Sequence, residues 1–290
     1  MEQAVELKGY FTKAEHRRAA AGYARYDGPA QAPRRGSWPR WLVRAAAVLA
    51  TLAVWQVASA ANLDVGISFV NIPTPATVGG ELWLLLQTPI FYMHALTSLQ
   101  RIAVSFVLAA VLGVIIGALM GRSRLFADLI LPQVELLRPI PAVAWIPLSI
   151  LMWPTEESSI LFIAFLGAFF PIVLNTRHGV EQTPEVLVKA ARSLGADRAA
   201  VFRHVVLTAA MPSITTGLAV GMGVSWFSLL AGEIISGQYG IGYFTWSSYT
   251  LVEYPKIIIG MIVIGMLGTG STILVRLATK PLLRWQGERE

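Results

Sequence analysis

Long apolar segments separated by short polar ones dominate the pattern along the chain. The hydrocarbon core of a bilayer is about 30 Å thick, so a helix that crosses it needs about 20 predominantly apolar residues. Six segments meet or approach this requirement: 41–61, 102–120, 125–153, 159–174, 214–231 and 257–277. The pattern therefore predicts an all-α polytopic membrane protein with six transmembrane helices.

The composition agrees with this pattern and excludes other classes of protein. Of the 290 residues, 55% are hydrophobic and only 14% are charged, whereas soluble domains carry about 25% charged residues. This balance excludes a disordered chain and an ordinary soluble two-domain enzyme. The chain contains no cysteine, so neither a disulfide framework nor a cysteine-ligated metal or redox centre is available.

Basic residues are distributed unevenly among the polar segments. Nineteen of the 23 Lys and Arg residues lie in segments 1–40, 121–124, 177–211 and 276–290, and the other polar segments together contain only Lys256. Because Lys and Arg favour the cytoplasmic side of a membrane, both termini are expected in the cytoplasm and the number of spans is expected to be even. The net charge of +6 is then a topology signal and does not indicate nucleic-acid binding.

Glycines recur at four-residue spacing in two of the apolar segments. Gly113, Gly117 and Gly121 lie in and just after the second segment, and Gly217 and Gly221 lie in the fifth. This spacing lines small residues along one helix face and lets another backbone approach closely. The approaching helix belongs either to the same chain or to a second subunit.

The third apolar segment is interrupted by prolines and charges. Proline removes a backbone hydrogen bond and clashes with the preceding turn, so the sequence Arg138-Pro-Ile-Pro141 predicts a break in the helix. Non-helical backbone at membrane depth persists only against protein or a water-filled cavity. Arg138 either pairs with Glu135, three residues before it, or faces a pathway and adds positive potential for an anion.

Three residues near the end of the fifth segment are further candidates for a pathway or gate. Glu233 is either a boundary carboxylate in the outer headgroup region or a buried charge that holds an outer gate. Ser225 and Trp226 lie about two turns deeper and either line a cavity or pack between helices.

The polar segment 177–211 has the pattern of two amphipathic helices. Thr183 is the expected N-cap of the first helix, with Pro184 at the first helical position. One apolar face has the spacing i, i+3, i+4 and i+7 and consists of Leu187, Ala190, Ala191 and Leu194. The opposite face is charged and consists of Glu185, Lys189 and Arg192. Gly195 fits the end of this helix, and Asp197 fits the N-cap of a second helix that runs to Pro212.

A family resemblance is carried by this segment. It contains the sequence Lys189-Ala-Ala-Arg-Ser-Leu-Gly195, followed by Val201-Phe-Arg-His-Val-Val-Leu207 and then Pro212. This resembles the "EAA" coupling loop of ABC importer permeases. The chain departs from the family pattern at Lys189, where the usual residue is Glu, and at Thr208, where it is Pro.

Three further motifs resemble one subfamily. They are Arg138-Pro-Ile-Pro-Ala-Val-Ala-Trp-Ile-Pro-Leu148, Gly167-Ala-Phe-Phe-Pro-Ile-Val-Leu-Asn175 and Gly240-Ile-Gly-Tyr243. These are similar to motifs of the nitrate, sulfonate, taurine and bicarbonate permeases, and they add Trp145 to the pathway candidates. The similarity covers about residues 94–286, a permease core with five spans. The first span, 41–61, and the polar N-terminal tail, 1–40, lie outside it.

The resemblance implies a type I ABC importer permease fold and a set of partners. These would be a second, usually identical, permease subunit, two cytosolic ATPase subunits and an extracytoplasmic solute-binding protein. Residues 184–195 would dock into the ATPase. The chain has no G-x-x-x-x-G-K-[ST] phosphate-binding loop, so ATP and Mg²⁺ would be bound by the partner ATPase subunits and no cofactor by this chain. The expected function is import of a small anion driven by ATP.

Two other functional classes fit the sequence less well. An ion-coupled secondary transporter often uses ionisable residues near the middle of the membrane, but all four histidines, His94 among them, are expected outside the spans. A membrane-embedded enzyme would need a catalytic or metal-binding group, and the sequence has no H-E-x-x-H motif and no histidine cluster in a span. We therefore expect no catalytic and no metal site.

Overall fold

The computed structural model describes residues 39–64, 66, 68–236 and 238–286. The predicted polar tail, residues 1–40, lies almost wholly outside this part. The described residues form helices joined by short connections, with one isolated β-bridge between Asp64 and Ser68. The chain divides into two compact units, residues 1–54 and 55–290. The first contains most of helix α2 (Arg40–Ala60), and the second contains the other described elements.

Five of the described helices are long and apolar enough to cross a membrane, and one bent pair is a sixth candidate. The five are α2, α4 (Pro89–Arg122), α7 (Glu156–Glu181), α10 (Leu207–Ser236) and α12 (Tyr254–Thr279). The bent pair consists of α5 (Arg124–Leu137) and, after a break, η1 (Ala142–Trp145) with α6 (Ile146–Met152). The all-α fold with five or six apolar spans is therefore confirmed.

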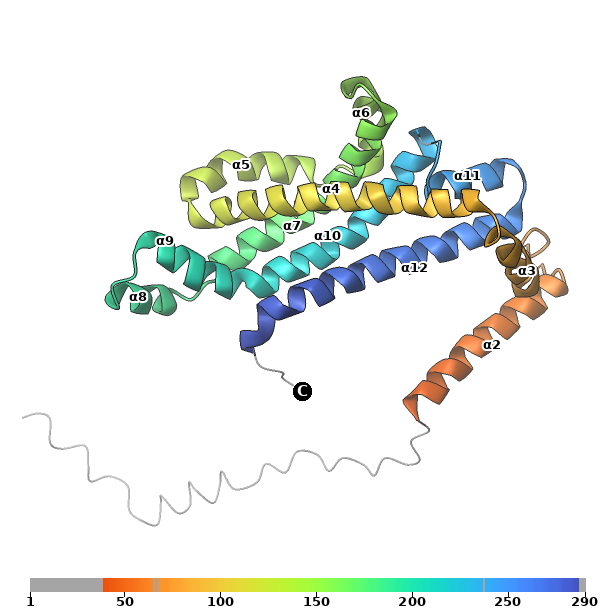
Figure 1. Ribbon diagram of the computed structural model, residues 1–290, viewed down its shortest axis with the longest axis horizontal. Coiled ribbons are helices and arrows are strands. Elements are labelled where there is room, and N and C mark those ends of the chain that lie inside the picture. The colour runs from red at the N-terminus through yellow and green to blue at the C-terminus, as the bar shows by residue number, and fades with distance from the viewer. Residues whose placement is uncertain (1–38, 65, 67, 237, 287–290) are drawn as a thin grey trace, which may run out of the picture. The chain divides into compact units, whose positions relative to one another are not determined.

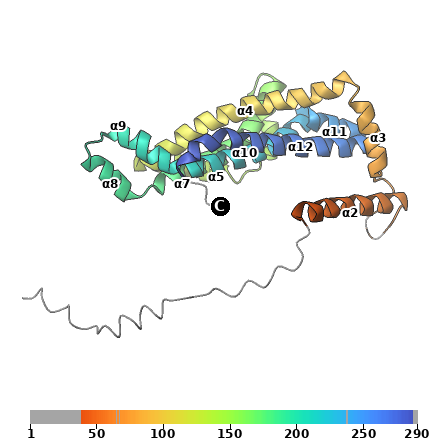
Figure 2. The ribbon, with the colours of Figure 1, turned by 60° about the horizontal axis from the view of Figure 1, so that its bottom comes forward.

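The remaining elements connect these helices or follow the last of them (Figure 1). They are α3 (Pro75–Leu85), α8 (Glu185–Ser193), α9 (Arg198–Ala200), η2 (Val201–Val206), α11 (Ile241–Thr250) and η3 (Lys280–Gln286). Within the second unit, α8 and α9 lie at one end of the long helices, and α11 lies at the other (Figure 1, Figure 2).

Helix α7 packs along both α4 and α10, and these three helices form the centre of the second unit. The predicted glycine rows are the contact points. A Cβ at Gly117 of α4 would lie 2.5 Å from the Val173 carbonyl oxygen of α7, and one at Gly221 of α10 would lie 3.0 Å from the Ala168 carbonyl oxygen. Backbones can approach this closely only without side chains between them. The glycine rows therefore serve packing within this chain.

Two helices extend well beyond the segments predicted for them. Helix α4 begins at Pro89, 13 residues before the predicted span, so that His94 and Arg101 lie on a span helix. The fifth span does not begin after Pro212, because the chain is helical from Arg198 to Ser236 and Pro212 lies inside α10.

The physical reason for the continuous helix lies in how its backbone is satisfied. The π-helical segment Val201–Val206 joins α9 to α10. Pro212 leaves the Thr208 carbonyl oxygen without its helical donor, and the packing of α10 against α7 lets such a proline persist inside a span.

We predict that Gly117→Ala destabilises the permease core. Its Cβ would press on the backbone of α7, and overpacking of this kind costs about 1–3 kcal/mol. The measurement is thermal unfolding of the detergent-purified chain. Gly79→Ala in α3, where a Cβ meets nothing within 4 Å, is the matched control. Equal melting temperatures of the two variants would contradict the packing role of Gly117.

Candidate functional site

The predicted break in the third span is present. Helix α5 ends at Leu137, and η1 and α6 continue at an angle of 94° to it. The residues between them include Pro139 and Pro141, which have no backbone N–H to continue the helical hydrogen-bond series. The break therefore follows directly from the sequence.

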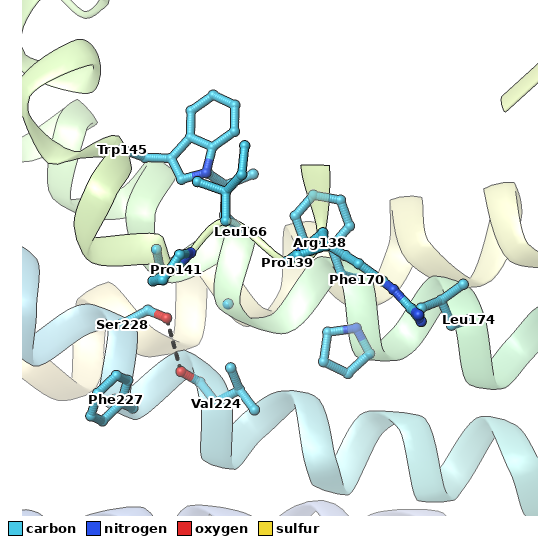
Figure 3. Close-up of a pocket in the computed structure, with 14 residues that line it drawn as sticks. Arg138, Pro139, Pro141, Trp145, Leu166, Phe170, Leu174, Val224, Phe227 and Ser228 are labelled. Atoms are coloured by element: carbon cyan, nitrogen blue, oxygen red, sulfur yellow. Dashed lines mark hydrogen bonds between the residues drawn. The ribbon is translucent and has the colours of Figure 1, made fainter. Parts of the chain in front are cut away.

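A cavity of about 530 Å³ lies at this break. Its walls come from the connection between α5 and η1, from α7 and from α10 (Figure 3). The lining residues are Arg138, Pro139, Ile140, Pro141, Ala142, Trp145, Leu166, Gly167, Phe170, Pro171, Leu174, Val224, Phe227 and Ser228. The interrupted backbone thus borders a cavity, which is one of the two settings in which non-helical backbone persists at membrane depth.

Arg138 is the one cation among the residues that line this cavity. In Figure 3 its side chain points away from Trp145, toward the end of the cavity that Leu174 lines. Arg138 and Glu135 are both exposed, and no ion pair between them is present in the described part of the chain. The structure therefore favours the second of the two predicted arrangements, in which Arg138 faces a cavity.

The other end of the cavity is formed by Trp145 (Figure 3). Its ring packs edge-on against Phe162 with centroids 6.5 Å apart. Its Nε1 is buried and has no hydrogen-bond partner among the described residues. The hydroxyl of Ser228 is turned back onto its own helix and donates to the Val224 carbonyl oxygen at 3.0 Å. Between its two ends the cavity is therefore predominantly apolar.

Ser225 and Trp226 do not line this cavity. The fully buried Ser225 hydroxyl donates to the Ala164 carbonyl oxygen of α7 at 2.7 Å. Trp226 belongs to the main core cluster and also borders a groove against α12, near Gly268. Both side chains occupy packing positions between helices.

Glu233 is fully buried near the C-terminal end of α10. Its carboxylate accepts hydrogen bonds from Ser98 Oγ at 2.8 Å, Arg101 Nη1 at 3.1 Å and the Gly242 N–H at 2.9 Å. Of the two predicted arrangements, the structure shows the buried charge. We call Ser98, Arg101, Glu157 and Glu233 the Glu233 cluster.

Arg101 connects four parts of the fold within this cluster. From α4 it donates to Glu233 of α10, to the Tyr239 carbonyl oxygen at 2.6 Å and to Glu157 of α7. The contact with Glu157 uses two nitrogens, Nε at 2.9 Å and Nη2 at 2.6 Å. Such two-pronged contacts restrict geometry more than single ones. The guanidinium therefore holds the ends of α4, α7 and α10 and the connection before α11 together.

The first turn of α11 is anchored to the same cluster. The Ile241 N–H donates to Ser98 Oγ at 2.9 Å, and the Gly240 N–H donates to His94 Nδ1 at 3.1 Å. Gly240 has a φ of +122°, and a Cβ there would collide with the Glu233 carboxylate. Side chains of α4 and α10 thus replace the cap that a helix start ordinarily finds in its own sequence.

The segment 177–211 contains the expected first helix, shifted by one residue. Helix α8 starts at Glu185, with Pro184 and not Thr183 as its N-cap. At its end Gly195 has a φ of +86°, its N–H donates to the Arg192 carbonyl oxygen, and the Ala196 N–H donates to the Ala191 carbonyl oxygen. These are the two bonds of a Schellman motif, so the predicted stop at Gly195 is confirmed.

The predicted apolar face of α8 is divided between two environments. Ala191 packs against the helices, together with Val188. In contrast, the side chains of Leu187 and Leu194 are 49% and 89% exposed, and Ala190 is exposed as well. The helix therefore displays apolar side chains at the end of the fold.

The charged residues of α8 are exposed. Lys189 Nζ donates to Glu185 Oε2 at 2.8 Å, and this contact holds the pKa of the Glu185 carboxyl below its usual value. Because both groups lie in solvent, the pair contributes little to stability. Arg192 is exposed, and Asp197 caps α9 by accepting from the Ala200 N–H at 2.6 Å, as predicted.

Residues 109–284 match the family of binding-protein-dependent transport system inner membrane components. The chain is also 33% identical over 239 residues to the nitrate import permease protein of Synechocystis sp., covering 79% of this chain and 85% of that one. The chain belongs to this permease family. It is therefore an ABC importer permease, a component of a transport system, and an inner-membrane protein with several spans.

Other relatives of this permease are similar over still larger shares of the chain. A Bacillus subtilis protein described as an aliphatic sulfonates transport permease is 30% identical over 260 residues, 89% of this chain and 91% of its own. Its Escherichia coli counterpart is 32% identical over 249 residues, 85% and 94% of the two chains. The matched regions include the cavity, α8 and the Glu233 cluster.

Sequence reasoning missed most of the Glu233 cluster, although the permease sequence contains a signal for it. His94, Ser98, Arg101 and Ser105 recur at spacings of four, three and four residues along an apolar helix, which is one helix face. All four are buried. A polar stripe in a span helix indicates an internal partner.

We predict that Arg101→Met strongly destabilises the permease. It leaves the Glu233 carboxylate buried without its cation, and breaking a buried pair in this way costs about 3–5 kcal/mol. The measurement is the melting temperature in detergent, with Arg122→Met on the exposed end of the same helix as the control. The additional change Glu233→Gln should recover part of the loss. Equal stability of the Arg101 and Arg122 variants would exclude this role.

Proposed function

We propose that this chain is the transmembrane permease subunit of an ATP-driven ABC importer for a small anion. The anion would be of the nitrate or aliphatic sulfonate class, with taurine and bicarbonate as related candidates. The observation that carries the proposal is Arg138, a cation without a carboxylate partner in the described part, which lines a cavity at a broken span. The names of the relatives, a nitrate permease and two sulfonate permeases, support this class of substrate.

The proposed topology has six spans with both termini in the cytoplasm. It counts the bent pair of α5 and α6 as one span. The excess of Lys and Arg in residues 1–40, 121–124, 177–211 and 276–290 supports this orientation through the positive-inside rule. Helices α8 and α9 then lie on the cytoplasmic side, and α11 lies on the outer side.

The proposed partners follow from this orientation. A second, usually identical, permease subunit would complete the pathway, and two cytosolic ATPase subunits would bind ATP and Mg²⁺, so that this chain needs no cofactor. Helix α8 would dock into an ATPase groove with its exposed apolar side chains, as amphipathic helices commonly do. The closing of the ATPases on ATP would then switch the access of the cavity, and a solute-binding protein would deliver the anion from outside.

An ion-coupled secondary transporter is the alternative function. The expectation that all histidines lie outside the spans is not met, because His94, His178 and His204 each lie within a helix that is long and apolar enough to cross a membrane. Arg101 and Glu233 are also ionisable and buried inside span helices. They are bonded to one another and to their surroundings, which supports a structural role. The importer is expected to work with ATP and without an ion gradient, and a secondary transporter is expected to do the opposite.

We predict that Arg138→Gln lowers the rate of anion uptake roughly ten- to a hundredfold at subsaturating substrate, because it removes a hydrogen bond to a charged group. The measurement is ATP-dependent uptake of nitrate and of butanesulfonate into proteoliposomes that contain the permease, its ATPase and its binding protein. Arg124→Gln, an exposed arginine at the start of α5 that does not line the cavity, is the control. Normal uptake by the Arg138 variant would contradict the proposal.

We predict that Leu194→Glu separates the permease from its ATPase and leaves membrane insertion normal. Leu194 is almost fully exposed, so the added carboxylate disturbs no packing within the chain but would charge the docking surface. Copurification of the ATPase with the tagged permease measures the effect. Gln182→Glu, an exposed position just before α8, adds the same charge as a control. Full copurification by the Leu194 variant would mean that α8 does not dock.

A further inference from the structure

The lining of the cavity at the broken span combines a single positive charge with extended apolar walls. The guanidinium of Arg138 lies at one end, and Trp145 lies at the other (Figure 3). Between them the wall is formed by Pro141, Leu166, Phe170 and Phe227 among others. The hydroxyl of Ser228 is occupied by the Val224 carbonyl oxygen, so it does not provide a free donor. The positive charge is therefore confined to one end.

These walls suit a nitrate ion poorly. Nitrate is polar on every side, and each of its oxygens would exchange hydrogen bonds to water for contact with apolar side chains, which is costly. Arg138 would satisfy only one side of the ion, and the unpaired Nε1 of Trp145 lies at the opposite end of the cavity. The cavity volume of about 530 Å³ also far exceeds the size of such an ion, since one water molecule occupies about 30 Å³.

The same walls suit an anion that has an apolar tail. Binding sites for organic molecules are typically apolar with a few polar groups that orient the ligand. A guanidinium binds the oxygens of a sulfonate as it binds those of a carboxylate or a phosphate. The alkyl chain would then lie against Pro141, Leu166 and Phe227 and point toward Trp145, where burial of each methylene is favourable.

We propose that this cavity is a binding site for an aliphatic sulfonate, with the sulfonate on Arg138 and the alkyl chain toward Trp145. The proposal rests on the proposed function, because it selects one substrate class within it. The cavity fits an amphiphilic anion. Two kinds of molecule have this chemistry, namely soluble alkanesulfonates and anionic lipids. The soluble ligand is favoured because two relatives that match most of the chain are described as sulfonate permeases, and the experiment separates the two sources.

The test measures equilibrium binding to the full-length permease, copurified with its ATPase and placed in phosphatidylcholine nanodiscs, by isothermal titration calorimetry. The probes are ethanesulfonate, butanesulfonate, hexanesulfonate and nitrate. We expect the affinity to rise up to about fourfold for each added methylene, and nitrate to bind at least tenfold more weakly than butanesulfonate. A flat response to chain length, or nitrate binding as tight as that of butanesulfonate, would overturn the proposal.

Two variants test separately the end of the cavity that binds the sulfonate and the walls that contact the alkyl chain. Arg138→Gln should weaken all three sulfonates by the same factor of ten or more and leave the dependence on chain length unchanged. Phe227→Ala should weaken hexanesulfonate more than ethanesulfonate. Met261→Ala on α12, which also removes an exposed apolar side chain but does not line the cavity, is the matched control. If the Phe227 and Met261 variants behave alike, the alkyl chain does not lie in this cavity.

Controls for unspecific and lipid binding complete the design. Butyl- and hexyltrimethylammonium have similar tails and the opposite charge, and they should not bind. In nanodiscs that contain phosphatidylglycerol, sulfonate affinity should be unchanged. Its loss there would assign the site to an anionic lipid and overturn the proposal.

Transport separates this inference from the proposed function. ATP-dependent nitrate uptake by the full complex, without chain-length-dependent binding, would refute the sulfonate site and preserve the importer. The absence of ATP-dependent uptake of any anion would refute the importer itself.

Discussion

The constraint on which the structure depends is that backbone polar groups inside a membrane need partners within the protein. Most of the described chain meets it with long helices. The prolines that follow Arg138 make this impossible over a few residues, and the chain there turns by 94° beside a cavity. The helices around the break hold it in place, because α7 packs closely on α4 and α10 through glycines. The site is therefore a consequence of one interrupted span in a rigid surrounding.

The buried and the cavity-lining charges of this permease have opposite surroundings. Arg101 is surrounded by two carboxylates and a carbonyl oxygen, and its positive charge is fully used in holding α4, α7, α10 and the start of α11. Arg138 lines a cavity and has no such partner in the described residues. A paired charge fixes geometry, and an unpaired one is available to a ligand. This difference separates the structural arginine from the proposed binding arginine.

Several features were predictable because they depend on local chemistry. The break at Pro139 and Pro141, the stop of α8 at Gly195 and the cap of α9 at Asp197 each follow from a backbone property of one residue. The continuity of α10 through Pro212 was not predictable in this way, since it depends on packing against α7. The outward position of Leu187 and Leu194 likewise depends on which side of α8 the other helices cover.

By itself, the sequence determined the membrane class, the apolar spans, the break in the third of them and the loop that resembles a coupling loop, because hydropathy, proline and glycine act over a few residues. Only the tertiary structure decided what the charges do. Glu135 and Arg138 are close in sequence and unpaired, whereas Arg101 and Glu233 are 132 residues apart and bonded. The partner of a charge is set by which helix faces pack together, and that arrangement belongs to the fold as a whole.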